Sequence, residues 1–292
     1  MRVLAFFVAL LVAGSAFAQR GLAISPPDPF IITELSASVV GNSTPVSLTP
    51  RATINTAETN VVVILAGQSL AANTSGTYSA PTNASAINNV NIYDGASYPP
   101  AANLLGCTNS AIGTGNVGTY LADQIINAGK AQRVWLVPIA VGGTSVADWA
   151  TGNLSGRIGV TMRRLASRGI TPSTTNTSFI FVWMQGEQDA SLGTSSAAYQ
   201  ASFATIVSAL TGAGFSGRIF VNLETYSGST NATIRAAQAA VVNGTTIFQG
   251  GDIDTLTGGT NRQGDNTHLT AAGASAAAGL IWTAIHATGA PY

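Results

Sequence analysis

The stretch Val61-Val62-Val63-Ile64-Leu65-Ala66-Gly67-Gln68-Ser69 combines a continuous, largely β-branched apolar run with an abrupt polar ending. Unbroken apolar runs of this kind are typical of strands that are buried on both faces of a parallel sheet. Gly67 ends the run, and Ser69 follows two positions later. The stretch therefore predicts a central parallel strand with a serine at its carboxyl end.

The rest of the chain alternates similar runs with segments of helical periodicity. Further strands are predicted at residues 134–141, 179–183, 218–223 and, from a weaker pattern, 245–248. Helices are predicted at residues 117–128, 157–167, 196–210, 232–242 and 271–285. This alternation favours an α/β fold, a doubly wound three-layer α/β/α sandwich with a central parallel sheet.

The composition limits the partners that this chain can attract. Of its 292 residues only 8% are charged, and 12 basic and 12 acidic side chains cancel to a formal net charge of zero. A neutral surface concentrates neither nucleic acid nor an anionic membrane around a protein. We therefore expect no nucleic-acid partner and no membrane partner. The single cysteine, Cys107, excludes a disulfide framework within the chain.

The N-terminus has the features of a secretory signal peptide. Met1-Arg2 precedes an apolar run over residues 3–13, and Ala16-Phe17-Ala18 provides a small-residue cleavage pattern. Residues 1–18 are therefore interpreted as a signal peptide, and residues 19–57 as a proline-rich N-terminal extension that forms an extended arm or a small hairpin. Residues 58–292 are predicted to form the main domain. The mature protein is expected to be secreted or periplasmic.

Residues 73–115 form a long polar stretch rich in Asn, Ser, Gly and Pro. Loops of this length in compact domains usually serve a function. Ligands of α/β sheets bind outside the carboxyl ends of strands, where this stretch begins. We therefore expect it to line the rim of a binding site.

Ser69 is predicted to stand at a strand-to-helix turn, a position where hydrolases can carry a nucleophile. The same position suits a serine that only caps the following helix, and this fragment alone leaves both interpretations open. The sequence is not the G-x-S-x-G elbow of α/β-hydrolases, because Ala71 occupies the place of the second glycine. A nucleophilic Ser69 therefore requires a different hydrolase architecture.

The chain has two histidines that can act as the base for such a serine. His286 lies at the end of the C-terminal helix pattern, where a structural or solvent-facing role is expected. His268 ends the polar stretch Asp265-Asn266-Thr267-His268, immediately before that helix. A carboxylate three residues before a histidine can accept a hydrogen bond from Nδ1 and orient the ring toward a serine. The alternative is a solvated turn that caps the helix.

Four blocks follow one another along the chain, namely Gly67-Gln68-Ser69, Gly142-Gly143-Thr144-Ser145-Val146-Ala147-Asp148-Trp149, Gln185-Gly186-Glu187-Gln188-Asp189 and Asp265-x-x-His268. Together they resemble the signature blocks of the SGNH-hydrolase superfamily, in the variant of sialate O-acetylesterases and the acetylxylan-esterase-like carbohydrate esterase family 6. The resemblance spans roughly residues 58–290. It implies a flavodoxin-like fold, no metal, no cofactor, and a serine esterase that removes O-acetyl groups from sialic acid or from an acetylated polysaccharide such as xylan.

The resemblance also implies roles for individual residues of the four blocks. Ser69 would attack the ester carbonyl, His268 would take the proton of Ser69, and Asp265 would orient His268. The oxyanion hole would be formed by the backbone N–H of Ser69, one of the glycines of the second block, and one amide side chain of the third block. The residues carried over for the latter two positions are Gly142 or Gly143, and Gln185.

Some positions of the third block keep two interpretations. Gln188 competes with Gln185 as the third oxyanion donor, and Gln68 is expected to support the same site. Glu187 either accepts a hydrogen bond behind the site loop or replaces Asp265 as the acidic partner of the base.

Two residues depart from the family pattern at the wall of the site. Leu70 stands where Asn is common in the relatives, and Met184 stands where His usually precedes the glutamine. Asp148 and Trp149 are expected to brace the second block, with a direct substrate contact by Trp149 as the alternative.

Two other functions fit the same blocks. A general short-chain or lipolytic esterase of the SGNH/GDSL type would use the same triad, because the triad does not choose the alcohol. A carbohydrate-binding pseudoenzyme would keep the fold without turnover, although all three types of triad residue are present.

Overall fold

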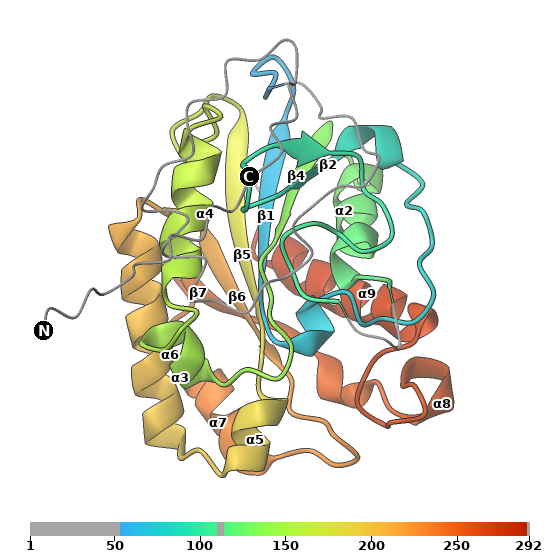
Figure 1. The fold of residues 1–292 in the computed structure, drawn as a ribbon, viewed down its shortest axis with the longest axis vertical. Helices are drawn as coiled ribbons and strands as arrows, with labels where there is room; N and C mark the ends of the chain where they lie inside the picture. The colour runs from blue at the N-terminus through green and yellow to red at the C-terminus, as the bar shows by residue number, and fades with distance from the viewer. Residues whose placement is uncertain (1–52, 110–113, 291–292) are drawn as a thin grey trace, which may run out of the picture.

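The computed structural model describes residues 53–109 and 114–290. The predicted signal peptide lies outside this part of the chain, as does the predicted N-terminal extension up to residue 52. The described part is built around one sheet with helices on both faces (Figure 1). This is the α/β/α sandwich that the alternation of strands and helices predicts.

The sheet has seven strands in the order β3-β2-β4-β1-β5-β6-β7. All neighbouring pairs are parallel except β2 and β3, which are antiparallel at one edge. The strands are β1 (Asn60–Gly67), β2 (Ile87–Val90), β3 (Ser97–Tyr98), β4 (Arg133–Pro138), β5 (Thr177–Met184), β6 (Arg218–Leu223) and β7 (Ile247–Asp252).

Strand β1 lies in the middle of the sheet, between β4 and β5, and all of its residues are buried. Val62 and Ile64 pack into the core on one face, whereas Val61 and Val63 pack into the core on the other. Because helices cover both faces, neither set of alternating positions is left for polar side chains. This explains the unbroken apolar run.

The helices form the two outer layers. Helices α4 (Gly156–Ala166), α6 (Ser196–Gly212) and α7 (Ala232–Ala240) pack on one face, and α2 (Val117–Asn127) and α9 (Ala271–Ala287) pack on the other (Figure 1). No helix of residues 53–109 and 114–290 is long and apolar enough to cross a membrane.

Short helices gather at the carboxyl ends of the strands, the lower end of the molecule in Figure 1. Helix α3 (Val146–Ala150) follows β4, α5 (Glu187–Leu192) follows β5, and α8 (Gly258–Asn261) follows β7. The chain leaves β1 for β2 and β4 on one side and then crosses to β5 on the other side. Ligands of open α/β sheets bind beside such a reversal of strand order, so the end of β1 is the expected site.

Most observed elements lie close to the predicted ones, but strand β4 ends at Pro138, three residues before its predicted end, and two further differences follow. Strand β7 starts at Ile247, two residues later than predicted, and runs to Asp252. Strands β2 and β3 lie inside the stretch 73–115, which we predicted to be a loop. The sequence of β2 is Ile-Asn-Asn-Val, and all four residues are buried. Because of its two asparagines, β2 lacks the continuous apolar pattern by which a buried strand is recognised.

Candidate active site

Ser69 begins the short 3-10 helix η1 (Ser69–Ala71), which follows β1. Gly67 makes the sharp exit from the strand, because its φ is +124° and a Cβ built there would lie 1.8 Å from the backbone oxygen of Met184. A side chain does not fit this position. The N–H of Gln68 donates to the same Met184 oxygen at 2.8 Å. Ser69 is thereby held at the carboxyl edge of the sheet, where it is 8% exposed.

The surroundings of Ser69 suit a nucleophile better than a cap. Gln68 occupies the cap position of η1, and no side chain caps this turn. The interpretation of Ser69 as a helix cap is therefore wrong. Thr74 Oγ1 donates to the Ser69 carbonyl oxygen at 2.6 Å, which fixes the turn. The N–H of Ser69 has no acceptor in the described part of the chain, so it is available to a ligand.

His268 lies between α8 and α9, with Asp265 beside it. The Nδ1 atom of His268 is 2.6 Å from Oδ2 of Asp265. Oδ1 of Asp265 accepts the backbone N–H groups of Thr267 and His268 at 3.0 and 2.9 Å. Partial burial favours the neutral carboxyl, but the hydrogen bonds outweigh it and lower the pKa of Asp265 below its usual 3.8. The ionised carboxylate therefore orients the ring through Nδ1 and leaves Nε2 to act on another group.

Gln263 joins the His268 loop to the Ser69 turn. Its Nε2 donates to the backbone oxygens of Thr74 and Leu269 at 2.6 and 2.7 Å, and its backbone N–H donates to the His268 oxygen at 2.7 Å. Thr74 in turn donates to Ser69. Among the described residues no hydrogen bond joins Ser69 Oγ directly to His268 Nε2. Such contacts are often long in an unliganded enzyme and tighten when substrate binds.

The second histidine is in a different environment. His286 is exposed near the end of α9 and stacks on Trp282, with ring centroids 5.2 Å apart. Helix α9 begins three residues after His268, which places His286 roughly 20–25 Å further along the helix axis. Of the two histidines, His268 is the one that shares the carboxyl edge with Ser69.

The glycines of the second block lie in the exposed turn after β4. The N–H of Gly142 donates to Thr108 Oγ1 at 2.9 Å. The N–H of Gly143 has no acceptor within the described residues. The two predicted donors therefore differ, since one is already hydrogen-bonded inside the protein and the other is not.

The remainder of the second block is a brace. Trp149 is 1% exposed, and its Nε1 donates to Thr144 Oγ1 at 3.0 Å. Asp148 and Ser145 form a capping box at the start of α3. Because the Trp149 ring is buried, the structure favours the bracing role over a direct substrate contact.

In the third block Gln185 is fully buried behind the Ser69 turn. Its Nε2 donates to Asp189 Oδ2, to the Thr144 oxygen at 3.2 Å and to Gln68 Oε1 at 3.3 Å. Both hydrogens of the amide are thus engaged, and the geometry favours a bracing role over the predicted oxyanion contact. Gln188 offers its backbone N–H to Gln68 Oε1 at 3.1 Å, and its side chain is partly exposed.

Glu187 lies next to Glu224, and Glu224 belongs to the loop after β6. Both side chains are buried, and none of their carboxyl oxygens has a hydrogen-bond partner of normal geometry among the described residues. Burial raises the pKa of Glu187 to about 7. Burial, together with the neighbouring Glu187, raises the pKa of Glu224 well above its usual 4.5. The structure thus places Asp265, and not Glu187, against His268.

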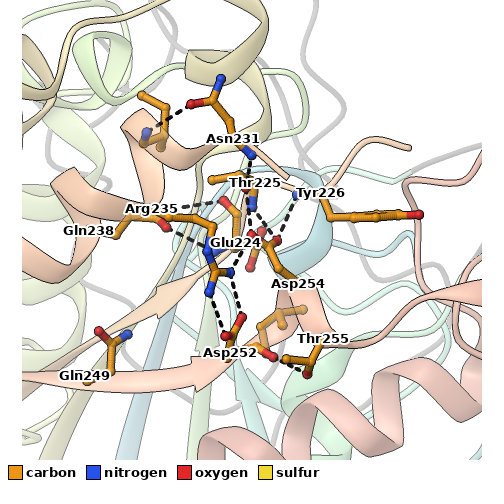
Figure 2. A network of polar contacts seen from close by, with 12 residues as sticks. Glu224, Thr225, Tyr226, Asn231, Arg235, Gln238, Gln249, Asp252, Asp254 and Thr255 are labelled. Carbon is orange, nitrogen blue, oxygen red and sulfur yellow. Dashed lines mark hydrogen bonds and ion pairs between the residues drawn. The ribbon is translucent and has the colours of Figure 1, made fainter. Parts of the chain in front are cut away.

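A polar network ties α7 to the ends of β6 and β7 (Figure 2). Arg235 of α7 forms ion pairs with Asp252 and Asp254 at 2.7 and 2.8 Å. Asp254 also accepts the N–H groups of Thr225 and Tyr226 at 2.6 and 2.9 Å. The hydrogen bonds to Asp254 therefore fix the loop after β6, as Figure 2 shows.

Arg262 connects this network to the loop that carries His268. Its Nη1 donates to the Thr267 oxygen at 2.6 Å and its Nη2 to the Ile253 oxygen at 2.8 Å. The guanidinium carbon lies 5.1 Å from the centroid of the Tyr226 ring. Arg262 is 1% exposed. A buried cation therefore anchors the loop of the predicted base from behind.

Three residues with a clear place in this site were given no role from the sequence. Asp189 accepts from Gln185, Gln263 joins the two loops, and Thr108 accepts from Gly142. Asp189 belongs to the third block, and its spacing of four from Gln185 on a helical turn could have indicated the contact. Thr108 and Gln263 act across long sequence separations, for which one sequence carries no pattern.

A comparison with protein families identifies the chain. Residues 59–284 match the model of the family described as carbohydrate esterase, sialic acid-specific acetylesterase. The chain belongs to this family. It is accordingly a carboxylic ester hydrolase, an esterase.

Solved structures with the same fold are distant in sequence. A protein from Arabidopsis thaliana superposes with a TM-score of 0.62 at 20% identity, covering 80% of the esterase and 99% of that chain. A carbohydrate acetylesterase from Xanthomonas citri superposes with a TM-score of 0.51 at 16% identity, covering 78% of the esterase and 56% of that chain. At these identities the likeness shows the fold alone. No curated protein sequence matches the esterase.

Proposed function

We propose that the esterase is a secreted enzyme that removes O-acetyl groups from a carbohydrate with a Ser69-His268-Asp265 triad. The observation that carries the proposal is the 2.6 Å contact between His268 Nδ1 and Asp265 Oδ2, in a loop that Gln263 ties to the Ser69 turn. Membership of an acetylesterase family supports the acetyl group as the acyl part.

Each triad residue then has a definite task. His268 Nε2 takes the Ser69 proton while Ser69 Oγ bonds to the acetyl carbon, and the electron pair of the carbonyl bond moves to its oxygen. In this proposal the N–H groups of Ser69 and Gly143, which have no acceptor among the described residues, hydrogen-bond this oxyanion. When the intermediate collapses, the sugar oxygen leaves with the proton from His268. Water then repeats the sequence on the acetyl-Ser69 ester and releases acetate.

The surface supports a sugar rather than a long acyl chain as the bulky part of the substrate. Leu192 is the exposed large hydrophobic residue of the described chain, with 62% exposure. The loops around His268 carry hydroxyl groups instead, such as those of the exposed Ser227 and the partly buried Thr267, whose oxygens are 2.8 Å apart. Hydroxyls suit the hydrogen-bonding groups of a carbohydrate, whereas a lipid chain requires an apolar groove.

The experiment compares the wild type with Ser69→Ala on three substrates, namely acetylated xylan, O-acetylated sialic acid and a long-chain p-nitrophenyl ester. We expect acetate release from one or both carbohydrates, little turnover of the long-chain ester, and a loss of orders of magnitude in Ser69→Ala with an unchanged circular dichroism spectrum. Preferred turnover of the long-chain ester would establish the lipolytic alternative. Sugar binding without any turnover would establish the pseudoenzyme.

Secretion is tested separately from catalysis. We expect export to depend on residues 1–18 and the mature protein to begin at Gln19. N-terminal sequencing of the exported protein measures this directly. An exported chain that retains Met1 would contradict the proposed cleavage.

A further inference from the structure

The segment 104–109 lies between the end of β4 and the Ser69 turn. The N–H of Thr108 donates to the Ala140 oxygen at 3.1 Å, and the Thr108 oxygen accepts from the Asn73 N–H at 3.0 Å. Asn73 Nδ2 also donates to the Leu104 oxygen at 2.8 Å. The segment therefore bridges the two loops that carry Ser69 and Gly142.

A buried arginine holds this segment from below. Arg157 is 0% exposed, and its Nε donates to the Ile139 oxygen at 2.9 Å while its Nη2 donates to the Gly106 oxygen. The guanidinium thus fastens the segment to the chain just after β4. Thr108 is consequently a positioned residue of the site and not part of a loose rim.

The hydroxyl of Thr108 and the side chain of Ser69, the proposed nucleophile, both lie close to Gly142. Its oxygen accepts from the Gly142 N–H at 2.9 Å. A methyl group built on Gly142 would lie 3.5 Å from this oxygen and 3.6 Å from Ser69 Cβ. A hydroxyl has one hydrogen to donate and two lone pairs to accept with. One lone pair is used by Gly142, whereas the hydrogen has no acceptor among the described residues.

We propose that Thr108 is a catalytic residue of the proposed esterase reaction, whose hydroxyl donates a hydrogen bond to the oxyanion that forms at Ser69. The Gly142 N–H acts through Thr108, because a hydroxyl that accepts a hydrogen bond becomes a better donor. The hydroxyl keeps its proton throughout, and the proton of Ser69 still passes to His268. Thr108 thereby takes the third place in the oxyanion hole, which Gln185, with both amide hydrogens engaged, leaves open.

If Thr108 only accepts the hydrogen bond of Gly142, removing its hydroxyl has the opposite effect on the rate. If the Thr108 hydroxyl only occupies the Gly142 N–H, it competes with the oxyanion for that donor. Removing the hydroxyl would then free the N–H and raise the rate or leave it unchanged. If Thr108 donates, removing it costs rate, because one oxyanion donor contributes about 10²–10³-fold to turnover.

The test uses Thr108→Val, which keeps the shape, and Thr108→Ser, which keeps the hydroxyl. Hydrolysis of p-nitrophenyl acetate should show kcat lowered about 10²-fold in Thr108→Val, with KM little changed and kcat largely restored in Thr108→Ser. Inactivation by a p-nitrophenyl alkylphosphonate, which leaves an anionic oxygen in the hole, should slow by a similar factor. The matched control is Thr205→Val, which removes an exposed hydroxyl from α6 and should leave both rates unchanged.

A well-folded Thr108→Val with wild-type or higher kcat would overturn the proposal, as would a Thr108→Ser as slow as Thr108→Val. Circular dichroism and urea unfolding check the fold, and Thr108→Ala takes the place of a valine variant that does not fold. Ser69→Ala separates this inference from the proposed function. If Ser69→Ala remains active the triad itself fails, whereas an inactive Ser69→Ala beside a fully active Thr108→Val refutes the role of Thr108 alone.

Discussion

Replacing Glu187 by glutamine is expected to stabilise the esterase at neutral and alkaline pH. Burial raises the pKa of Glu187 from 4.5, the value of an exposed carboxyl, to about 7 in the folded chain. Between these two pH values the unfolded chain has released this proton, while the folded chain still holds it. The stability that goes with the buried neutral carboxyl is therefore complete below pH 4.5 and is lost as the pH rises to about 7.

The size of the effect follows from the two pKa values. One pKa unit corresponds to about 1.4 kcal/mol, so a rise from 4.5 to about 7 corresponds to about 3 kcal/mol of unfolding free energy. Glutamine has nearly the same shape and carries no charge, so it avoids this loss. We expect Glu187→Gln to match the wild type within about 1 kcal/mol at pH 5 and to exceed it by about 3 kcal/mol at pH 8.

Urea unfolding followed by circular dichroism at pH 5 and pH 8 measures these free energies. The control is Glu58→Gln, because a 2.6 Å hydrogen bond from Arg133 lowers the pKa of Glu58, and its stabilising effect is therefore present above pH 4.5. Glu58→Gln should gain no stability at pH 8. A wild type whose stability is constant from pH 5 to pH 8, or a Glu187→Gln variant with no advantage at pH 8, would refute the reasoning.

Three further predictions concern the proposed triad. Asp265→Asn should lower acetyl-ester turnover about 10⁴-fold, because an amide favours the wrong tautomer of the histidine, whereas Glu187→Gln should stay near wild type; the reverse result would make Glu187 the acidic partner. His268→Ala should abolish turnover and His286→Ala should not, and kinetics on both purified variants decide between the two histidines. Gln263→Leu should lower kcat roughly 10-fold or more, because the loop that carries His268 loses its hydrogen bond to the Ser69 turn. Gln263→Asn should not restore kcat, because its side chain is too short to make the same hydrogen bonds. A wild-type kcat in a folded Gln263→Leu variant would contradict the role of Gln263 in joining the two loops.

The parts of the fold that could be predicted are those with a local pattern. Strand β1 is buried on both faces, so its apolar run directly predicts a central position in the sheet. Strand β2 could not be predicted from an apolar pattern, because the buried Asn89 in its middle is polar and is held by hydrogen bonds. The Asn89 side chain bonds the Leu105 N–H and oxygen at 2.7 and 3.0 Å. A polar residue satisfied by a distant loop looks like a loop residue in the sequence.

The residues of the site also differ in whether a local sequence pattern predicts their contacts. Asp265 and His268 are three residues apart, so their contact follows from a turn that the sequence already contains. The task of Gln185 depends on Asp189, Thr144 and Gln68, which meet only after β1, β4 and β5 are aligned in the sheet. The residue types of the site could therefore be predicted, whereas the choice of which amide or hydroxyl contacts the oxyanion could not.

Four neutral amide side chains link the loops of the site, and this has a consequence for its pH dependence. Gln68 and Gln185 join the first and third blocks, and Gln263 joins the loops of Ser69 and His268. Gln238 donates to the backbone oxygens of Gln185 and Glu224 at 2.9 and 3.0 Å. Amide side chains do not titrate, so these links persist at any pH at which the chain is folded. A change of stability between pH 4.5 and pH 8 therefore reports on the buried carboxyl pair of Glu187 and Glu224 and not on these amide links.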